Sequence, residues 1–398
     1  MKLEIQRQDF LKAWQTAEKV VSSKSVADIM GCIRINAKEE GQVILEATDL
    51  KTSVRYKTSG VTVIEGGEAV LPAAILGNML RKLTSDTFTI DVNEKRGILD
   101  AGKSRMKFPF VSADEFPHIP DSQGAESICE IISGDLKRMI SEGGSASSAP
   151  QDFPKYIGAC LLRTTENSLR IVSTDGKRLA ISERFCTVNR KDENSMLTSG
   201  ALKDLAKQLP DTENVRIFSD GPVVWFSISD VEFSIRKIEA TFPEYERILG
   251  TDIHTILNIS CAELISVVER IDIVAKTTLS HIMVMDMTSD HQLKITSISP
   301  EQGIARESLE ADITGESLQV GFNAGYFLEG LKAFGTGDIE IEFSGAEGQT
   351  RMTRKDDSSF LYMLMPSRLS PQDLVDDELN DSSQSQYQEE NLEGEGNF

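Results

Sequence analysis

The chain has 398 residues, of which 39% are hydrophobic and 26% charged, and these proportions are typical of a folded globular protein. At roughly 150 residues per domain, the length predicts two or three domains. No window offers the roughly 18 uninterrupted apolar residues of a membrane span, and the start, MKLEIQRQDF, lacks the apolar core of a signal peptide. Full-length disorder and a membrane bundle are therefore excluded, and we expect a cytoplasmic protein.

The net charge of −21 comes from 42 basic and 63 acidic residues. A protein that binds nucleic acid by bulk electrostatics normally carries the opposite sign. The charge is uneven, because residues 370–398 contain nine acidic residues and no Lys or Arg, which leaves −12 on residues 1–369. Low hydrophobicity combined with high charge predicts that residues 370–398 form a disordered, solubilising tail.

Six amphipathic stretches predict helices, which in chain order lie at 9–21, 72–84, 135–145, 199–209, 262–275 and 323–334. The first, third and fifth start 126 and 127 residues apart, and the second, fourth and sixth start 127 and 124 residues apart. Pro72, Ser199 and Asn323 stand at or beside a first turn, where such residues favour helix starts. The chain therefore contains three repeats with two helices each.

β-Branched and apolar runs between these helices predict strands, for example at 42–47, 169–173 and 292–297. Two of these runs lead into Thr48-Asp49-Leu50 and Thr174-Asp175-Gly176, which are 126 residues apart, as are Phe116-Pro117 and Phe242-Pro243. We expect three tandem α+β domains at 1–124, 125–250 and 251–369, followed by the acidic tail at 370–398. Two helices per domain suggest an internal pseudo-twofold, and hence six half-domains in one chain.

The sequence lacks the motifs of common enzyme classes, including G-x-x-x-x-G-K-[ST], G-x-G-x-x-G after a strand, H-E-x-x-H and G-x-S-x-G. Five cysteines stand far apart with no C-x-x-C, which favours reduced thiols and disfavours a zinc site. We therefore expect no catalytic residue, no metal and no cofactor, and a function based on shape and contact. Two alternatives stay open: a hydrolase with an unrecognised site, and a protein scaffold that does not bind DNA.

The six predicted helices together carry ten basic and nine acidic residues, so they are nearly neutral within a strongly acidic chain. This contrast suggests a helical surface that tolerates a polyanion and holds it weakly.

Three tandem α+β repeats, the run Thr174-Asp175-Gly176-Lys177-Arg178-Leu179, the segment Phe242-Pro243-Glu244-Tyr245 and the terminal segment 362–369, YMLMPSRL, closely resemble the bacterial β sliding clamp, the β subunit of DNA polymerase III. The resemblance covers residues 1–369. It implies a non-catalytic processivity factor of the replicative polymerase: a head-to-tail homodimer of six domains around a central hole, with helices lining the hole and antiparallel sheets outside. Such a ring encircles double-stranded DNA and slides without sequence specificity.

The resemblance also implies two kinds of binding residue. DNA would contact Lys24, Gln151, Lys155 and Tyr156, although the family more often has an aromatic residue at the position of Lys155. Polymerases, the clamp loader and repair proteins would insert a peptide, containing a Gln and an apolar end, between the second and third domains. Residues of this groove would be Ile157, Thr174, Gly176, Lys177, Arg178, Leu179, Pro243, Arg247, Ile248, Asn323, Tyr326, Met363, Met365, Pro366, Ser367 and Arg368, with Ser367 in place of a frequent Met.

The ring would close by edge-to-edge strand pairing between the first domain of one chain and the third domain of the other. The residues expected at this seam are the apolar Met106, Phe108, Ile273 and Val274, and the charged Lys103, Arg105, Glu301 and Glu307. In the tail, Gln372-Asp373-Leu374-Val375 faintly resembles a clamp-binding peptide, and our hypothesis is that the tail weakly competes with partners for the groove.

Overall fold

The computed structural model describes residues 1–21, 28–38, 41–93, 96–109, 111–149, 153–250 and 252–374. Two predicted DNA contacts, Lys24 and Gln151, and residues 375–398 of the predicted tail lie outside the described residues. The chain forms two compact units made of interleaved segments. Unit 1 consists of Met1–Ser141, Ala149–Ile171 and Glu183–Phe242, and unit 2 of Glu142–Ser148, Val172–Ser182 and Pro243–Phe398.

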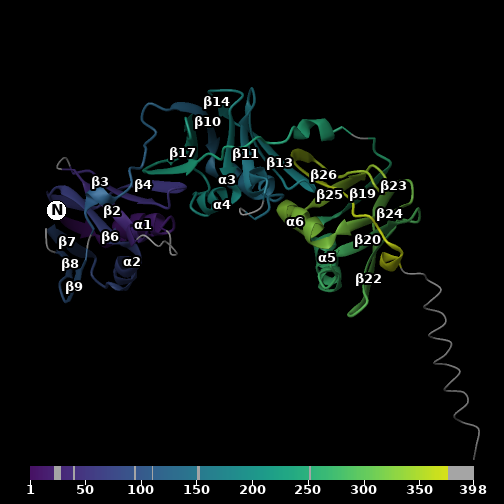
Figure 1. The fold of residues 1–398 in the computed structure, drawn as a ribbon, viewed down its shortest axis with the longest axis horizontal. Helices are drawn as coiled ribbons and strands as arrows, with labels where there is room; N and C mark the ends of the chain where they lie inside the picture. Colours follow the sequence, from purple (N-terminus) through teal and green to yellow (C-terminus); the bar gives the residue numbers. More distant parts are fainter. Residues whose placement is uncertain are drawn as a thin grey trace, which may run out of the picture. The chain divides into compact units, whose positions relative to one another are not determined.

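Unit 1 contains two antiparallel sheets (Figure 1). The five-stranded sheet has the order β5 (Val61–Glu65), β1 (Lys2–Gln6), β7 (Thr87–Asn93), β8 (Arg96–Ala101) and β9 (Ser104–Phe108). The nine-stranded sheet has the order β14 (Thr187–Val188), β10 (Glu126–Ile132), β16 (Asn214–Asp220), β17 (Val223–Ile228), β18 (Val231–Arg236), β4 (Thr52–Thr58), β3 (Val43–Thr48), β2 (Cys32–Ala37) and β6 (Gly67–Pro72). Three more strands are hydrogen-bonded to one another in the order β15 (Asn194–Thr198), β11 (Ala159–Thr164) and β12 (Ser168–Thr174).

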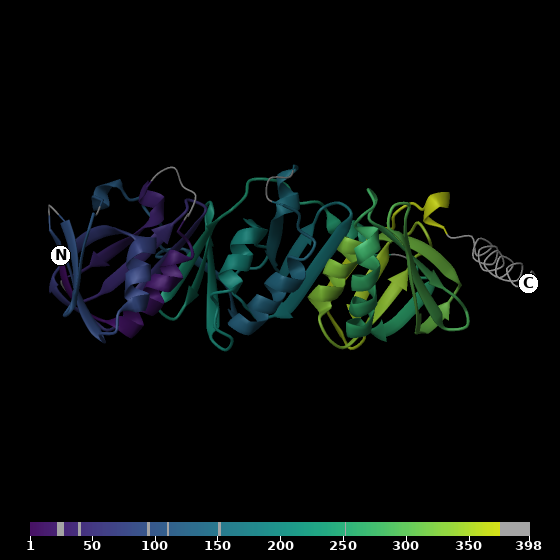
Figure 2. The same ribbon diagram turned by 90° about the horizontal axis from the view of Figure 1, so that it is seen from below.

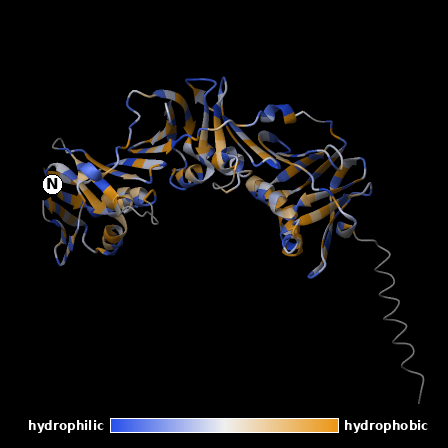
Figure 3. Cartoon of the chain, viewed as in Figure 1, coloured by the Kyte–Doolittle hydropathy of each residue, from blue (hydrophilic) through white to orange (hydrophobic). Residues whose placement is uncertain are grey.

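Unit 2 also consists of antiparallel strands. One run of strands has the order β13 (Arg178–Phe185), β27 (Asp357–Leu364), β26 (Thr350–Arg354), β25 (Asp338–Phe343), β19 (Thr255–Ser260) and β23 (Asp312–Gly315). A four-stranded sheet has the order β22 (Gly303–Glu310), β21 (Gln292–Ser299), β20 (Ile282–Met287) and β24 (Leu318–Asn323). Buried and exposed residues alternate along strands such as β7 and β19, and Figure 3 shows the matching alternation of hydropathy.

The predicted helices are all present, as α1 (Arg7–Glu18), α2 (Ala73–Lys82), α3 (Ser133–Gly143), α4 (Ser199–Ala206), α5 (Cys261–Ala275) and α6 (Ala324–Phe334). The expected cap is made by Asn323, whose side chain accepts a hydrogen bond from Tyr326 N. Ser199 is the first residue of α4 and Pro72 directly precedes α2, as expected, although neither Pro72 nor Thr198, the N-cap residue of α4, makes a side-chain cap hydrogen bond. Among the described residues, no helix is both long and apolar enough to cross a membrane.

Helix–sheet packing supplies the core of each unit. In α1, Phe10, Ala13, Trp14 and Ala17 are buried at helical spacing, and Trp14 Nε1 donates to the Ala73 carbonyl at the start of α2 (3.1 Å). In unit 2, α5 packs against α6, and the two helices lie side by side against the sheets (Figure 2). The buried apolar residues form one large cluster in each unit, so each unit has its own hydrophobic core.

The predicted repeat is visible in single hydrogen bonds of two turns, one between β3 and β4 and the other between β12 and β13. Thr48 Oγ1 donates to the Thr52 carbonyl (3.0 Å), and Thr174 Oγ1 donates to the Arg178 carbonyl (2.6 Å). Each threonine Oγ1 also accepts from the amide two residues later, and the next two amides donate to the aspartate Oδ1 of the same turn. The same threonine-aspartate turn therefore recurs 126 residues apart.

The central residue of this turn adopts a left-handed backbone conformation in both repeats, with φ of +72° at Leu50 and +86° at Gly176. Glycine adopts this conformation without strain, whereas a Cβ atom makes it unfavourable. The exposed Leu50 therefore strains the turn of the first repeat.

We predict that Leu50→Gly raises the free energy of unfolding by about 1 kcal/mol relative to Leu50→Ala, because both changes remove the exposed side chain and only glycine relieves the strain. Urea denaturation of the two variants measures this difference. Equal stability of the two variants would contradict the prediction.

Candidate functional site

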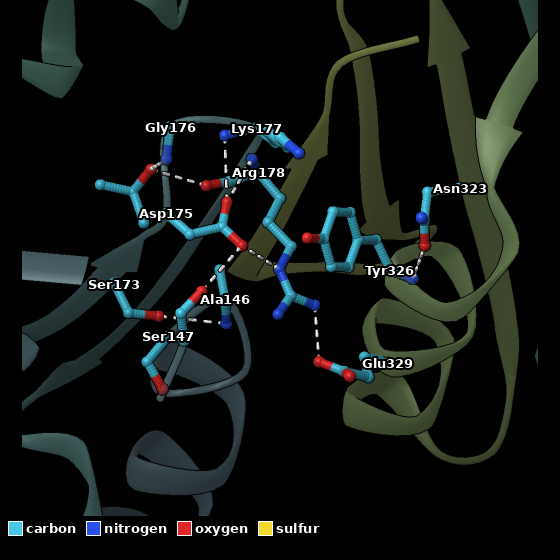
Figure 4. Close-up of polar contacts among 12 residues, drawn as sticks. Ala146, Ser147, Ser173, Asp175, Gly176, Lys177, Arg178, Asn323, Tyr326 and Glu329 are labelled. Atoms are coloured by element: carbon cyan, nitrogen blue, oxygen red, sulfur yellow. Dashed lines mark hydrogen bonds and ion pairs between the residues drawn. The ribbon is translucent and has the colours of Figure 1, made fainter. Parts of the chain in front are cut away.

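The side chain of Arg178 organises one face of unit 2. Its Nε donates to Asp175 Oδ2 (2.9 Å), and its Nη1 donates to Glu329 Oε2 (2.6 Å) of α6. The guanidinium carbon lies 4.3 Å from the ring centroid of Tyr326, a cation–π distance (Figure 4). Arg178 thus ties the threonine-aspartate turn to α6.

Most of this network is buried. The side chains of Arg178 and Asp175 are 4% and 5% exposed, whereas that of Glu329 is 56% exposed. Burial by itself would lower the pKa of Arg178, but Tyr362 and Glu329 outweigh it and raise the pKa above its usual value. Burial also raises the pKa of Tyr362, whose hydroxyl donates to the Tyr326 carbonyl (2.8 Å). The arginine therefore stays charged and the tyrosine stays protonated.

Next to this network, strand pairing positions two methionines differently. Leu179 of β13 lies opposite Met363 of β27, and both side chains are buried. Just after β27, the Met365 amide donates to the Lys177 carbonyl (2.9 Å), and the Met365 side chain is 47% exposed. Met363 therefore serves the core, while Met365 offers an apolar side chain at the surface.

The predicted groove residues of α6 and of the terminal segment also lie in unit 2. Asn323 and Tyr326 are half-buried at the start of α6, and the Ser367 amide donates to the Gly321 carbonyl (2.8 Å). Pro366, Ser367 and Arg368 line a cavity of about 370 Å³ together with Gln319, Ala346, Glu347 and Leu369. The terminal segment is thus held against β24 with open space beside it.

The other predicted groove residues are placed as follows. Pro243, Arg247 and Ile248 are exposed around the short 3₁₀ helix Tyr245–Ile248 of unit 2, where Arg247 pairs with Glu244. Ile157 is half-buried in unit 1. Most of the predicted set is therefore gathered in unit 2.

Sequence reasoning missed the residues that hold the site, namely Asp175, Glu329 and Tyr362. The aspartate of the repeated threonine-aspartate turn was visible in the sequence, but its bond to a buried guanidinium was not. No sequence pattern linked Glu329 to Arg178, because a contact across 151 positions depends on tertiary packing.

Two strands named in the predicted seam lie at the edges of their sheets: β9 ends the five-stranded sheet of unit 1 and β22 ends the four-stranded sheet of unit 2. Lys103 and Arg105 are exposed beside or on β9, with Arg105 Nε 3.6 Å from Asp100. On unit 2, Ile273 of α5 is 59% exposed, Val274 is half-buried and Glu301 is exposed. Edge strands of this kind can pair with another chain.

Phe108 of the predicted seam is buried in the core of unit 1 beside Gly97. A Cβ at Gly97 would fall 2.1 Å from the Phe108 ring. Met106 shares this inward face of β9 and is half-buried, because alternate residues of a strand point the same way. The Phe108 ring therefore packs into the hydrophobic core of unit 1.

Glu307 also has a partner within its own chain. Arg270 of α5 donates to it through Nε and Nη2, and this hydrogen bonding holds the pKa of Glu307 below its usual value.

Of the predicted DNA contacts, Lys155 and Tyr156 are described. They open a 3₁₀ helix, Lys155–Gly158, with Lys155 exposed and the Tyr156 ring edge-on to Phe242 at 6.1 Å. No three His, Cys, Asp or Glu side chains in the described ranges are grouped to bind a metal.

We predict that Arg178→Met lowers the free energy of unfolding by about 3 kcal/mol, because it leaves Asp175 buried without its charged partner. Glu329→Gln is the matched control and should cost less than about 1 kcal/mol, since Glu329 is exposed. In a double-mutant cycle measured by urea denaturation, Asp175→Asn should cost less in the Arg178→Met background than alone. Additive effects would contradict the coupling.

Three family models match consecutive parts of the chain. They describe the N-terminal domain (residues 1–120), the central domain (130–244) and the C-terminal domain (246–368) of the DNA polymerase III beta subunit. A beta sliding clamp of Staphylococcus aureus strain Mu50 is 27% identical over 378 residues, which are 92% of this chain and 99% of that protein.

Solved structures agree with this match. The DNA polymerase sliding clamp of Bacillus subtilis has a TM-score of 0.88 and 25% identity, and the DNA polymerase III subunit beta of Pseudomonas aeruginosa has a TM-score of 0.87 and 25% identity. Each likeness covers 93% of this chain and 100% of the other. The chain therefore belongs to the DNA polymerase III beta subunit family, the bacterial sliding clamps.

Proposed function

We propose that this chain is the processivity clamp of a bacterial replicative polymerase, acting in the cytoplasm as a homodimeric ring around double-stranded DNA. The observation that carries this proposal is the consecutive match to the N-terminal, central and C-terminal domains of one subunit. The proposed domains are 1–124, 125–250 and 251–369, with 370–398 as an acidic tail. The chain itself is a non-catalytic subunit, and its partner polymerase forms the phosphodiester bonds.

Ring closure would use the two edge strands. Pairing β9 of one chain with β22 of another satisfies main-chain groups that each edge otherwise presents to solvent. The exposed Ile273 and the half-buried Val274 and Met106 supply apolar contact, while Lys103, Arg105 and Glu301 supply rim charges of small individual effect. Phe108, which packs in the core of unit 1, and Glu307, which pairs with Arg270, complete the proposed set of seam residues.

DNA contact in this proposal is weak and independent of sequence. Several basic side chains of the helices are already neutralised, as in the ion pairs Arg81–Glu18, Lys137–Asp211 and Lys332–Glu269. A closed ring retains DNA by topology, so weak phosphate contacts permit sliding without dissociation. Lys24, Gln151, Lys155 and Tyr156 are the proposed contacts.

Partner proteins would bind the groove of unit 2 through short peptides with a Gln and an apolar end. Met365 supports this assignment, because its exposed side chain directly follows Leu364, which pairs with Arg178, and the Arg178 guanidinium stacks on Tyr326. A methionine side chain can repack against different ligands, which suits a site that binds polymerases, the clamp loader and repair proteins one after another.

We predict that Ile273→Asp converts the dimer to a monomer of 43.9 kDa, because the new carboxylate would be buried without a partner at the seam. Size-exclusion chromatography with light scattering gives the mass. Leu279→Asp, at a fully exposed leucine of unit 2, is the control and should stay dimeric. A dimeric Ile273→Asp variant would place the seam elsewhere.

We predict that Met365→Ala weakens binding of a fluorescein-labelled partner peptide by about tenfold or more, because it removes an apolar anchor. Fluorescence anisotropy measures the affinity. Phe185→Ala, which removes an even more exposed apolar side chain of unit 1, is the control and should bind normally. Unchanged affinity in Met365→Ala would remove this methionine from the groove.

A further inference from the structure

Two hydrogen bonds that hold the terminal segment of unit 2 recur in unit 1. In unit 2, the Met365 amide donates to the Lys177 carbonyl (2.9 Å); in unit 1, the Arg236 amide donates to the Lys51 carbonyl (2.8 Å). Lys177 and Lys51 occupy the same place in the repeated threonine-aspartate turn. Arg236 is therefore the structural counterpart of Met365.

The second hydrogen bond extends the correspondence by two residues. The Ser367 amide donates to the Gly321 carbonyl (2.8 Å), and the Ile238 amide donates to the Met196 carbonyl (2.8 Å). Gly321 lies in β24, directly before α6, as Met196 lies in β15, directly before α4. The segment 236–239 thus runs past a turn and a helix start as 365–368 does.

A cavity of about 750 Å³ opens at this place in unit 1. Its volume lies within the range of ligand pockets. One of its residues, Thr198, is at the N-cap position of α4, as Asn323 is at that of α6. The lining is formed by Lys51, Lys155, Gly158, Thr198, Pro222, Arg236, Lys237, Ile238 and Glu239.

The charge of this cavity differs from that of the groove in unit 2. Lys237 Nζ is already engaged by Glu193 (3.1 Å) and Ser219 (2.7 Å). Burial would raise the pKa of Glu193, but hydrogen bonds from Ser195, Ser219 and Lys237 hold it at about 2, so this pair stays ionised. Lys237 is thus compensated within the chain.

Three cations of the lining have no ion-pair partner among the described residues. Lys51, Lys155 and Arg236 are exposed, and within the described part of the chain none of them forms an ion pair. Among the described residues of the lining, Glu239 is the one acidic member. The cavity is therefore positively charged on a strongly acidic protein.

We propose that this cavity is a second peptide-binding site, which takes a short acidic segment of a partner protein. Carboxylates of the segment would pair with Lys51 and Arg236, and with Lys155 when that lysine is not in contact with DNA, and an apolar side chain would rest on Pro222 and Ile238. The exchange of Met365 for Arg236 at equivalent positions turns an apolar anchor point into a cationic one, so the two sites select different partners. This site lies wholly in unit 1 and does not depend on the groove of unit 2.

A peptide fits this cavity better than a nucleic acid. The apolar floor of Pro222 and Ile238 offers contact to a side chain, and Glu239 repels a continuous phosphate backbone. A duplex is too wide to enter a hollow of this volume.

The test uses the full-length chain and a fluorescein-labelled peptide of sequence DEDLDELED in fluorescence anisotropy at low salt. Arg236→Met combined with Lys51→Met should weaken binding about tenfold or more, because it removes two of the three lining cations that form no ion pair within the described residues. Lys191→Met combined with Lys207→Met changes the net charge equally at exposed lysines of unit 1 outside the cavity, and should bind normally. A peptide with Lys in place of each acid should not bind.

Other outcomes would overturn the proposal. These are no saturable binding by the unaltered chain, equal binding by the Arg236→Met/Lys51→Met variant, or loss of single-stranded DNA binding but not of peptide binding in that variant. Met365→Ala should leave the acidic peptide's affinity unchanged. If Met365→Ala alone abolished that binding, the acidic peptide would occupy the groove of unit 2, and the proposed function would stand while this inference fell.

Discussion

Main-chain pairing between repeats is the constraint on which the structure depends. In unit 1, β18 of the second repeat pairs with β4 of the first, and in unit 2, β13 of the second repeat pairs with β27 of the third. Each of these two strand pairs places a threonine-aspartate turn beside the end of a strand from the next repeat. The turns, the hydrogen bonds of Lys51 and Lys177, and the two proposed binding sites all depend on this pairing.

The same pairing explains why two sites of one architecture can differ in chemistry. The same backbone hydrogen bond forms from the Arg236 amide to Lys51 and from the Met365 amide to Lys177, and a backbone hydrogen bond does not restrict which side chain stands there. Met365 and Arg236 therefore occupy equivalent positions, one with an apolar side chain and the other with a positively charged one. Only the site in unit 2 carries the buried Arg178, which ties its turn to α6; the first repeat has Thr52 at the equivalent place and a strained Leu50 in the turn.

The sequence was sufficient for the features that depend on local periodicity. Helical spacing located α1 to α6, and the 126-residue offset identified the two turns. It could not show which way a strand faces: alternation grouped Met106 with Phe108, but only packing against Gly97 shows that this face points inward. It also could not pair Arg178 with Glu329 or Arg270 with Glu307, since these contacts form between distant segments. The cationic cavity of unit 1 was missed for the same reason.

Topological retention on DNA is the central claim, and it is tested most directly by loading the protein onto a nicked circular plasmid with its clamp loader and then cutting the plasmid once. Gel filtration separates DNA-bound from free protein. The account predicts that the protein stays with the circular DNA at a salt concentration that abolishes ordinary charge-based binding, and is released when the DNA is made linear. Equal retention on circular and linear DNA would contradict encirclement.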